Sequence, residues 1–138
     1  MGGAISQIEA VNPCVSKCIE RLRSLTLDEI VTFYSSVKTR TDKMSINFSE
    51  FNDIFELGLE DFNIWDTEHR NLINIFEFLT GVVMIGKMDF DARVNCLFDF
   101  FDFNNVGRLC NDELRLMITI VCQSVSKIKE ISLHLKDT

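Results

Sequence analysis

Apolar residues recur along the chain mostly at intervals of three and four, the spacing of a buried helical face. One proline and six glycines are too few for the many turns of a β-rich fold. Two helix starts are visible: Asn12-Pro13, with asparagine as the cap, and Thr26 followed by Glu29, which together form a capping box. The sequence therefore predicts an all-α fold with room only for short paired strands. After the second start, five residues are expected to face the core: Ile30, Val31, Phe33, Tyr34 and Val37.

A short motif is repeated three times, at residues 46–51, 73–78 and 109–114. Each copy follows a polar stretch and opens a helix, so the chain is read as three helix-loop-helix units. The first two copies are only 27 residues apart, against 36 for the next interval. The incoming helix of the second unit, around residues 59–65, must therefore be short. The three loops are 39–50, 66–77 and 102–113.

The loop 102–113 has the residue order of an EF-hand calcium loop. Asp102 stands first, Asn104 third, Gly107 sixth and Glu113 twelfth. Ca²⁺ takes six to eight oxygen ligands, and the final glutamate usually supplies two of them. The predicted ligands are Asp102, Asn104, the carbonyl oxygen of Arg108, and Glu113. Leu109 is expected to form the strand contact between paired loops.

Two positions of this loop lack the usual oxygen. Val106 stands fifth and Cys110 stands ninth, so few ligands remain, with two formal negative charges among them. Since affinity depends on ligand charge and rigidity, calcium is expected to bind weakly, at roughly 10⁻⁴ M or poorer, or not at all.

The other two loops are poorer still. The loop 66–77 places Arg70 fifth, a cation inside the expected cage, although Asn71 at the sixth place tolerates the left-handed turn. The loop 39–50 has Lys43 fifth and Met44 sixth, and is not expected to bind metal.

Residues 26–125 resemble the calcineurin B-like and neuronal calcium sensor group of EF-hand proteins. The resemblance rests on Phe33-Tyr34 ahead of the first loop, on residues 73–82 after the second, and on residues 97–102 leading into the third. It implies hands that pair through short strands and a hydrophobic groove that receives an amphipathic helix of a target protein. The resemblance also makes calcium the implied cofactor.

No fourth loop follows the third hand, because only 25 residues come after Glu113. The third hand therefore lacks a partner within the chain, and its apolar surfaces need cover from a target, a second copy, the C-terminal segment or residues outside this sequence. An apolar stripe after the loop and a second one toward the end support two alternatives: segment 126–138 folds back in place of a target helix, or it exchanges in a homodimer. The stripes comprise Leu114, Met117, Ile118 and Val121, and then Ile128, Ile131 and Leu135.

The amino terminus fits the N-myristoylation pattern, with Gly2 as acceptor and Ser6 at the sixth position. An incidental flexible start and a remnant of cloning are the alternatives. A single myristoyl chain binds membranes marginally, and palmitoylation of Cys14 or Cys18 would supply a second anchor. The alternative for both cysteines is simple core packing.

The net charge of −7 excludes nucleic acid as a favoured partner, and residues 50–113, with fourteen acidic and four basic residues, suit a basic one. Five cysteines without a CxxC pair indicate a reducing compartment. No nucleophile or acid–base cluster indicates an enzyme. The expectation is a cytoplasmic adaptor at the cytosolic face of a membrane, and the alternative is a calcium sensor acting through the third hand. Its parts are an N-terminal lipid-anchor region and helix (1–25), a degenerate EF-hand pair (26–87), and a third EF-hand with a C-terminal helix (88–138).

Overall fold

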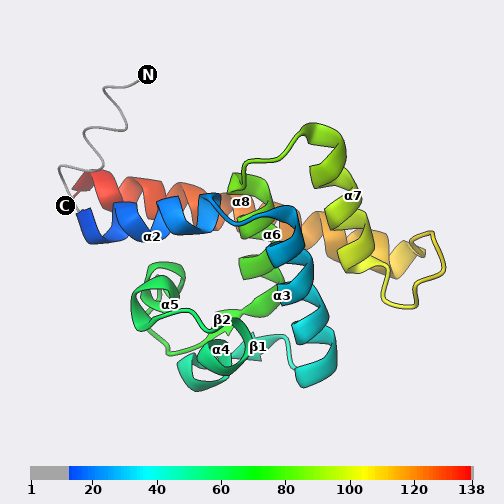
Figure 1. Cartoon of the computed structure of the whole chain (residues 1–138), viewed down its shortest axis with the longest axis horizontal. Coiled ribbons are helices and arrows are strands. Elements are labelled where there is room, and N and C mark those ends of the chain that lie inside the picture. The colour runs from blue at the N-terminus through cyan, green and yellow to red at the C-terminus, as the bar shows by residue number, and fades with distance from the viewer. Residues whose placement is uncertain (1–12, 138) are drawn as a thin grey trace.

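The computed structural model describes the backbone of residues 13–137 and the side chains of residues 17–133. This part of the chain is mostly helical, which confirms the predicted all-α class with short paired strands (Figure 1). The elements in chain order are α2 (Pro13–Arg23), α3 (Leu27–Arg40), β1 (Ser45–Ile46), α4 (Phe48–Phe55), α5 (Leu59–Trp65), β2 (Ile73–Asn74), α6 (Ile75–Ile85), α7 (Phe90–Phe101) and α8 (Asn111–Asp137).

The first hand begins at the predicted capping box. The Thr26 hydroxyl oxygen accepts the Glu29 backbone N–H, and the Glu29 carboxylate accepts the Thr26 backbone N–H, so two otherwise unpaired donors of α3 are satisfied. A second capping box, Asn47 with Glu50, opens α4 after the first loop. Local side chains therefore fix both helix starts of this hand.

The first two hands pair through one antiparallel strand pair. Ser45 lies opposite Asn74 and Ile46 opposite Ile73. Ile46 and Ile73 are both buried, so the register places one apolar residue from each loop in the core. Within the described residues the third loop forms no strand, so Leu109 lies in irregular backbone rather than in the expected strand contact.

The second hand has the short incoming helix that the loop spacing predicts, with α5 covering residues 59–65. Its last residue, Trp65, lies against Gly81 in the middle of α6. A Cβ atom built at Gly81 would lie 2.2 Å from the Trp65 ring, far inside van der Waals contact. The glycine is therefore required by the close approach of the indole.

Aromatic rings fill the centre of the hand pair. Phe78 packs edge-on against Phe51 and Trp65, with ring centroids 5.2 and 5.8 Å apart, and Phe51 packs in turn against Phe55 and Phe62. These five side chains are buried. They join α4, α5 and α6 in one core.

The third hand packs on the second hand rather than on a fourth. Phe100 and Phe101 of α7 are buried, and Phe76 of α6 lies 5.3 and 6.2 Å from them by ring centroids. Helix α8 packs against α5, α6 and α7. The buried rings of α7 and the buried face of α8 are thus covered within the chain.

Helix α8 is one continuous 27-residue helix that runs along the long axis of the molecule (Figure 1). The C-terminal segment does not turn back, because residues 126–137 continue the helix without a break. It nevertheless covers apolar surface within the chain, since Ile131 is buried and Ile128 packs against the core. The first predicted stripe is partly misplaced: Met117 packs against the core, but Leu114 and Ile118 are 42% and 54% exposed, and Ile120 is buried instead. The exchange of this segment in a homodimer stays a prediction.

Candidate functional site

The third loop is folded around its first acidic residue. Asp102 ends α7, and its two carboxylate oxygens accept the backbone N–H groups of Val106 (3.2 Å) and Gly107 (2.9 Å). Gly107 has φ of +81°, a left-handed conformation that glycine adopts without strain. The predicted turn at the sixth position is therefore present.

The last acidic residue closes the same loop. The carboxylate of Glu113 accepts the N–H of Cys110 at 2.9 Å and the N–H of Phe103 at 3.0 Å. These hydrogen bonds, chiefly that from Cys110, lower the pKa of Glu113. The first and last predicted ligands thus lie on one loop that is closed by its own backbone donors.

The donor set of this loop does not fill a calcium coordination sphere. The Asn104 and Arg108 residues are exposed, Val106 at the fifth position is 62% exposed and supplies no side-chain oxygen, and Cys110 at the ninth is exposed as well. Among the described residues, no three His, Cys, Asp or Glu side chains are grouped so that they could hold a metal ion. Two of the usual ligand positions of the loop therefore lack a side-chain oxygen.

Basic side chains lie in the other two loops. In the first, the Lys43 Nζ atom lies 3.3 Å from the Glu50 carboxylate, so the fifth and twelfth positions form an ion pair. In the second, the Arg70 guanidinium lies 3.0 Å from the Glu68 carboxylate. Asn71 adopts φ of +56°, as its place in the loop predicts.

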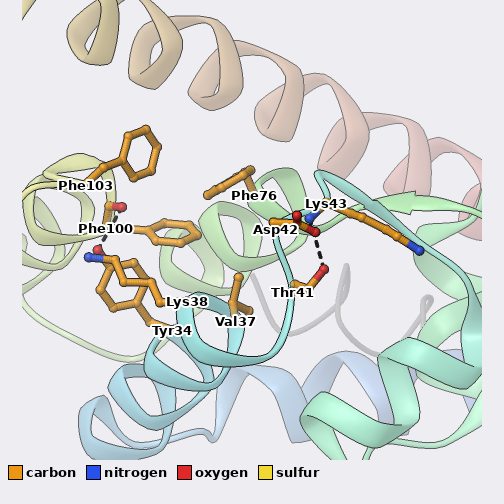
Figure 2. Close-up of a pocket in the computed structure, with 9 residues that line it drawn as sticks. All are labelled: Tyr34, Val37, Lys38, Thr41, Asp42, Lys43, Phe76, Phe100 and Phe103. Atoms are coloured by element: carbon orange, nitrogen blue, oxygen red, sulfur yellow. Dashed lines mark hydrogen bonds between the residues drawn. The ribbon is translucent and has the colours of Figure 1, made fainter.

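An apolar pocket of about 150 Å³ lies between α3, α6 and α7 (Figure 2). Its wall is formed by the rings of Tyr34, Phe76, Phe100 and Phe103 together with Val37. The lining also includes polar residues of α3 and the first loop: Lys38, Thr41, Asp42 and Lys43. The pocket has room for one large apolar side chain.

A larger groove, of about 740 Å³, runs between α3 and α7. Its apolar floor includes Leu27 and Val31, which are both exposed. The sequence placed Val31 in the core, and this expectation is wrong because nothing in the described structure covers that part of α3. Three acidic residues of the α7 segment line the groove without any basic residue: Asp89, Asp91 and Asp99.

Tyr34 lines both the apolar pocket and the larger groove. Its hydroxyl donates to the carbonyl oxygens at the end of α7, those of Asp99 and Phe100, the latter at 2.9 Å. Burial, followed by the nearby Asp99 and Asp102 carboxylates, raises the pKa of Tyr34 above its usual range. Helical spacing predicted only a core role for Tyr34, because a hydroxyl bond over 66 positions leaves no local signal.

The predicted lipidation residues fall in different surroundings. Gly2 lies outside the described residues, and Cys14 belongs to α2 but its side chain is not described. Cys18 is fully buried, donates to the Glu60 carboxylate over 3.7 Å, and has its pKa raised to about 12, chiefly by burial. A buried, protonated thiol is a poor acyl acceptor, so the structure disfavours Cys18 and supports the core-packing alternative there.

The paired helix-loop-helix units, the strand pair and the residue order of the third loop are those expected of an EF-hand type of protein. The chain is 27% identical over 131 residues to the type 2 calcineurin B subunit of Dictyostelium discoideum, covering 87% of this chain and 72% of that protein. It is 25% identical over 103 residues to calcium-binding protein J of the same organism, covering 68% of this chain and 53% of that protein. Sequence and geometry together confirm the resemblance to calcium-binding EF-hand proteins. No family model and no solved structure gave a match.

Proposed function

We propose that the protein is a non-enzymatic EF-hand adaptor that binds an amphipathic helix of a target protein with little or no dependence on calcium. The proposal rests on two neighbouring sites along α3 and α7. One is the apolar pocket, the other is the acidic groove, and both are lined by Tyr34. The similarity to a calcineurin B protein and to a calcium-binding protein supports a regulatory role.

The lining of the groove selects the chemistry of the helix. Leu27 and Val31 offer apolar contact, and the aspartates along α7 offer negative charge at the rim. A helix with a large apolar side chain for the pocket and basic residues beside it would satisfy both surfaces. The charge would chiefly speed and orient association, whereas the buried apolar contact would supply most of the affinity.

This proposal predicts selective binding of a basic amphipathic peptide. A labelled helical peptide of leucine and lysine should bind in EDTA, and its leucine and glutamate counterpart should not, because the groove is acidic. Val31→Arg should weaken binding about tenfold by adding bulk and positive charge to the groove. Fluorescence anisotropy of the labelled peptide measures both effects.

Val125→Arg is the matched control, since Val31 and Val125 are each 47% exposed and only Val31 lines the groove. It should change the dissociation constant less than about twofold. Equal binding of both peptides, or an equal loss in both variants, would contradict the proposal.

The proposed adaptor is held at the cytosolic face of a membrane by a myristoyl chain on Gly2. The motif at residues 2–6 supports this. None of the described helices is long and apolar enough to cross a bilayer. Cys14 is the remaining candidate for a second acyl group, since Cys18 is buried.

Replacing the lipid acceptor tests the anchor. Gly2→Ala should shift a C-terminal fluorescent fusion from membranes to the soluble fraction, because alanine does not accept the myristoyl group. Gly3→Ala is the neighbouring control and should leave the distribution unchanged. A Gly2→Ala fusion that fractionates like the parent would rule out the lipid anchor.

A further inference from the structure

Helix α8 of the third hand contacts the second loop through two polar side chains. The Ser124 hydroxyl, which is fully buried, donates to the Glu77 backbone carbonyl at 2.9 Å. One turn further along, the Lys127 Nζ atom donates to the Thr67 hydroxyl at 2.7 Å. Both partners belong to loop 66–77, so α8 is fixed on this loop by directed bonds as well as by apolar packing.

Lys127 reaches a polar cavity of about 300 Å³ beside the second loop. The residues at the first, third and twelfth loop positions line the same cavity: Asp66, Glu68 and Glu77. In an EF-hand loop these three positions supply calcium ligands. The ammonium group of α8 therefore lies on the side of the loop where its acidic residues gather.

Three acidic residues and two basic ones, Arg70 and Lys127, line this cavity. Glu77 is half-buried, and burial raises its pKa, whereas the charge of Lys127 is the main influence that lowers it. Arg70, the basic residue within the loop itself, pairs with the exposed Glu68 instead. Asp66 has its carboxylate occupied by the backbone N–H groups of Arg70 and Asn71.

The first loop also has a basic side chain close to its acidic residues. There Lys43, at the fifth position, pairs directly with Glu50 at the twelfth. In the second loop the corresponding residue, Arg70, also lines the cavity but pairs with Glu68, and Lys127 of α8 supplies the second basic side chain of the lining, which includes Glu77. Both degenerate hands thus combine a protein cation with the acidic twelfth position, through a direct ion pair in the first loop and through a shared cavity in the second.

We infer that Lys127 is the built-in cation of the second hand. Its ammonium group neutralises loop 66–77 in place of a metal ion and, through Thr67, holds α8 on the first pair of hands. The arrangement of the third hand is then independent of calcium. An ordinary surface lysine with one hydrogen bond would contribute little to stability and would not depend on Glu77.

The test removes the charge while keeping the length of the side chain. In EDTA, Lys127→Met should raise the unfolding equilibrium constant roughly five- to tenfold, because a partly buried acidic cluster loses its cation. Lys129→Met, an exposed position on the same helix, should change it less than about twofold. Trp65, the single tryptophan of the chain, lines this cavity and reports urea unfolding by fluorescence.

A double-mutant cycle separates the charge effect from the hydrogen bond. In a Glu77→Gln background the effect of Lys127→Met should fall to less than half, because the carboxylate that needs the cation is gone. Thr67→Val, which removes only the hydrogen bond, should cost less than Lys127→Met. Additive effects of the Lys127 and Glu77 variants, or equal effects of Lys127→Met and Lys129→Met, would overturn the inference.

Discussion

Phe78→Ala should lower the free energy of unfolding by about 3–5 kcal/mol, the cost of truncating a fully buried aromatic residue. Phe78 has no exposed surface and contacts the rings of Phe51, Phe55 and Trp65. The substitution would leave a cavity where α4, α5 and α6 meet. Since small domains are stable by only about 5–15 kcal/mol, the variant should unfold at a much lower urea concentration, as measured by circular dichroism.

Phe90→Ala is the matched control, because this phenylalanine is 74% exposed at the start of α7. Its effect should stay within about 0.5 kcal/mol of zero. Similar losses in the two variants would show that the aromatic core has been placed wrongly.

Val106→Asp should strengthen calcium binding to the third loop by at least about tenfold, because it restores a charged oxygen at the fifth position. In the parent chain we expect a dissociation constant of roughly 10⁻⁴ M or weaker. Gly107 already provides the turn, and Asp102 and Glu113 already frame the loop, so the missing oxygen is the main defect. Calorimetric titration with calcium measures the change.

Two further variants serve as controls for the calcium titration. Val125→Asp adds the same charge on α8 outside the loop and should leave calcium affinity unchanged, whereas Glu113→Gln should abolish any binding by Val106→Asp. If Val106→Asp is folded but binds calcium no better than the parent, the ligand assignment is wrong. A micromolar isotherm in the parent that Glu113→Gln abolishes would instead favour the calcium sensor.

Features that depend on residues a few positions apart in the chain could be predicted from the sequence. The Thr26 and Glu29 capping box is present, and the interval between motifs correctly predicted that α5 is short. Asn71 and Gly107 adopt the left-handed backbone that their loop positions require. These features are local because a cap or a turn is decided by hydrogen bonds and steric limits over a few residues.

The candidate binding surface could be predicted only in part from the sequence. The acidic excess of residues 50–113 indicated a basic partner, and three aspartates of this region do line the groove. The apolar floor was missed, since Val31 has the helical spacing of a core residue and is nevertheless exposed. Periodicity identifies an apolar residue, but its exposure depends on whether another element covers it.

The sequence by itself determined the class of fold, the pairing of the first two hands and the left-handed turns at Asn71 and Gly107. Only the tertiary structure decided that α8 continues past Ser126, that Ile120 rather than Ile118 is buried, and that Lys127 meets the second loop. The physical reason is that α8 carries apolar residues on more than one face, so its own periodicity leaves the choice of buried face open. Packing against α6 and the bonds from Ser124 and Lys127 to loop 66–77 make that choice, through contacts 47 and 60 positions apart in the chain.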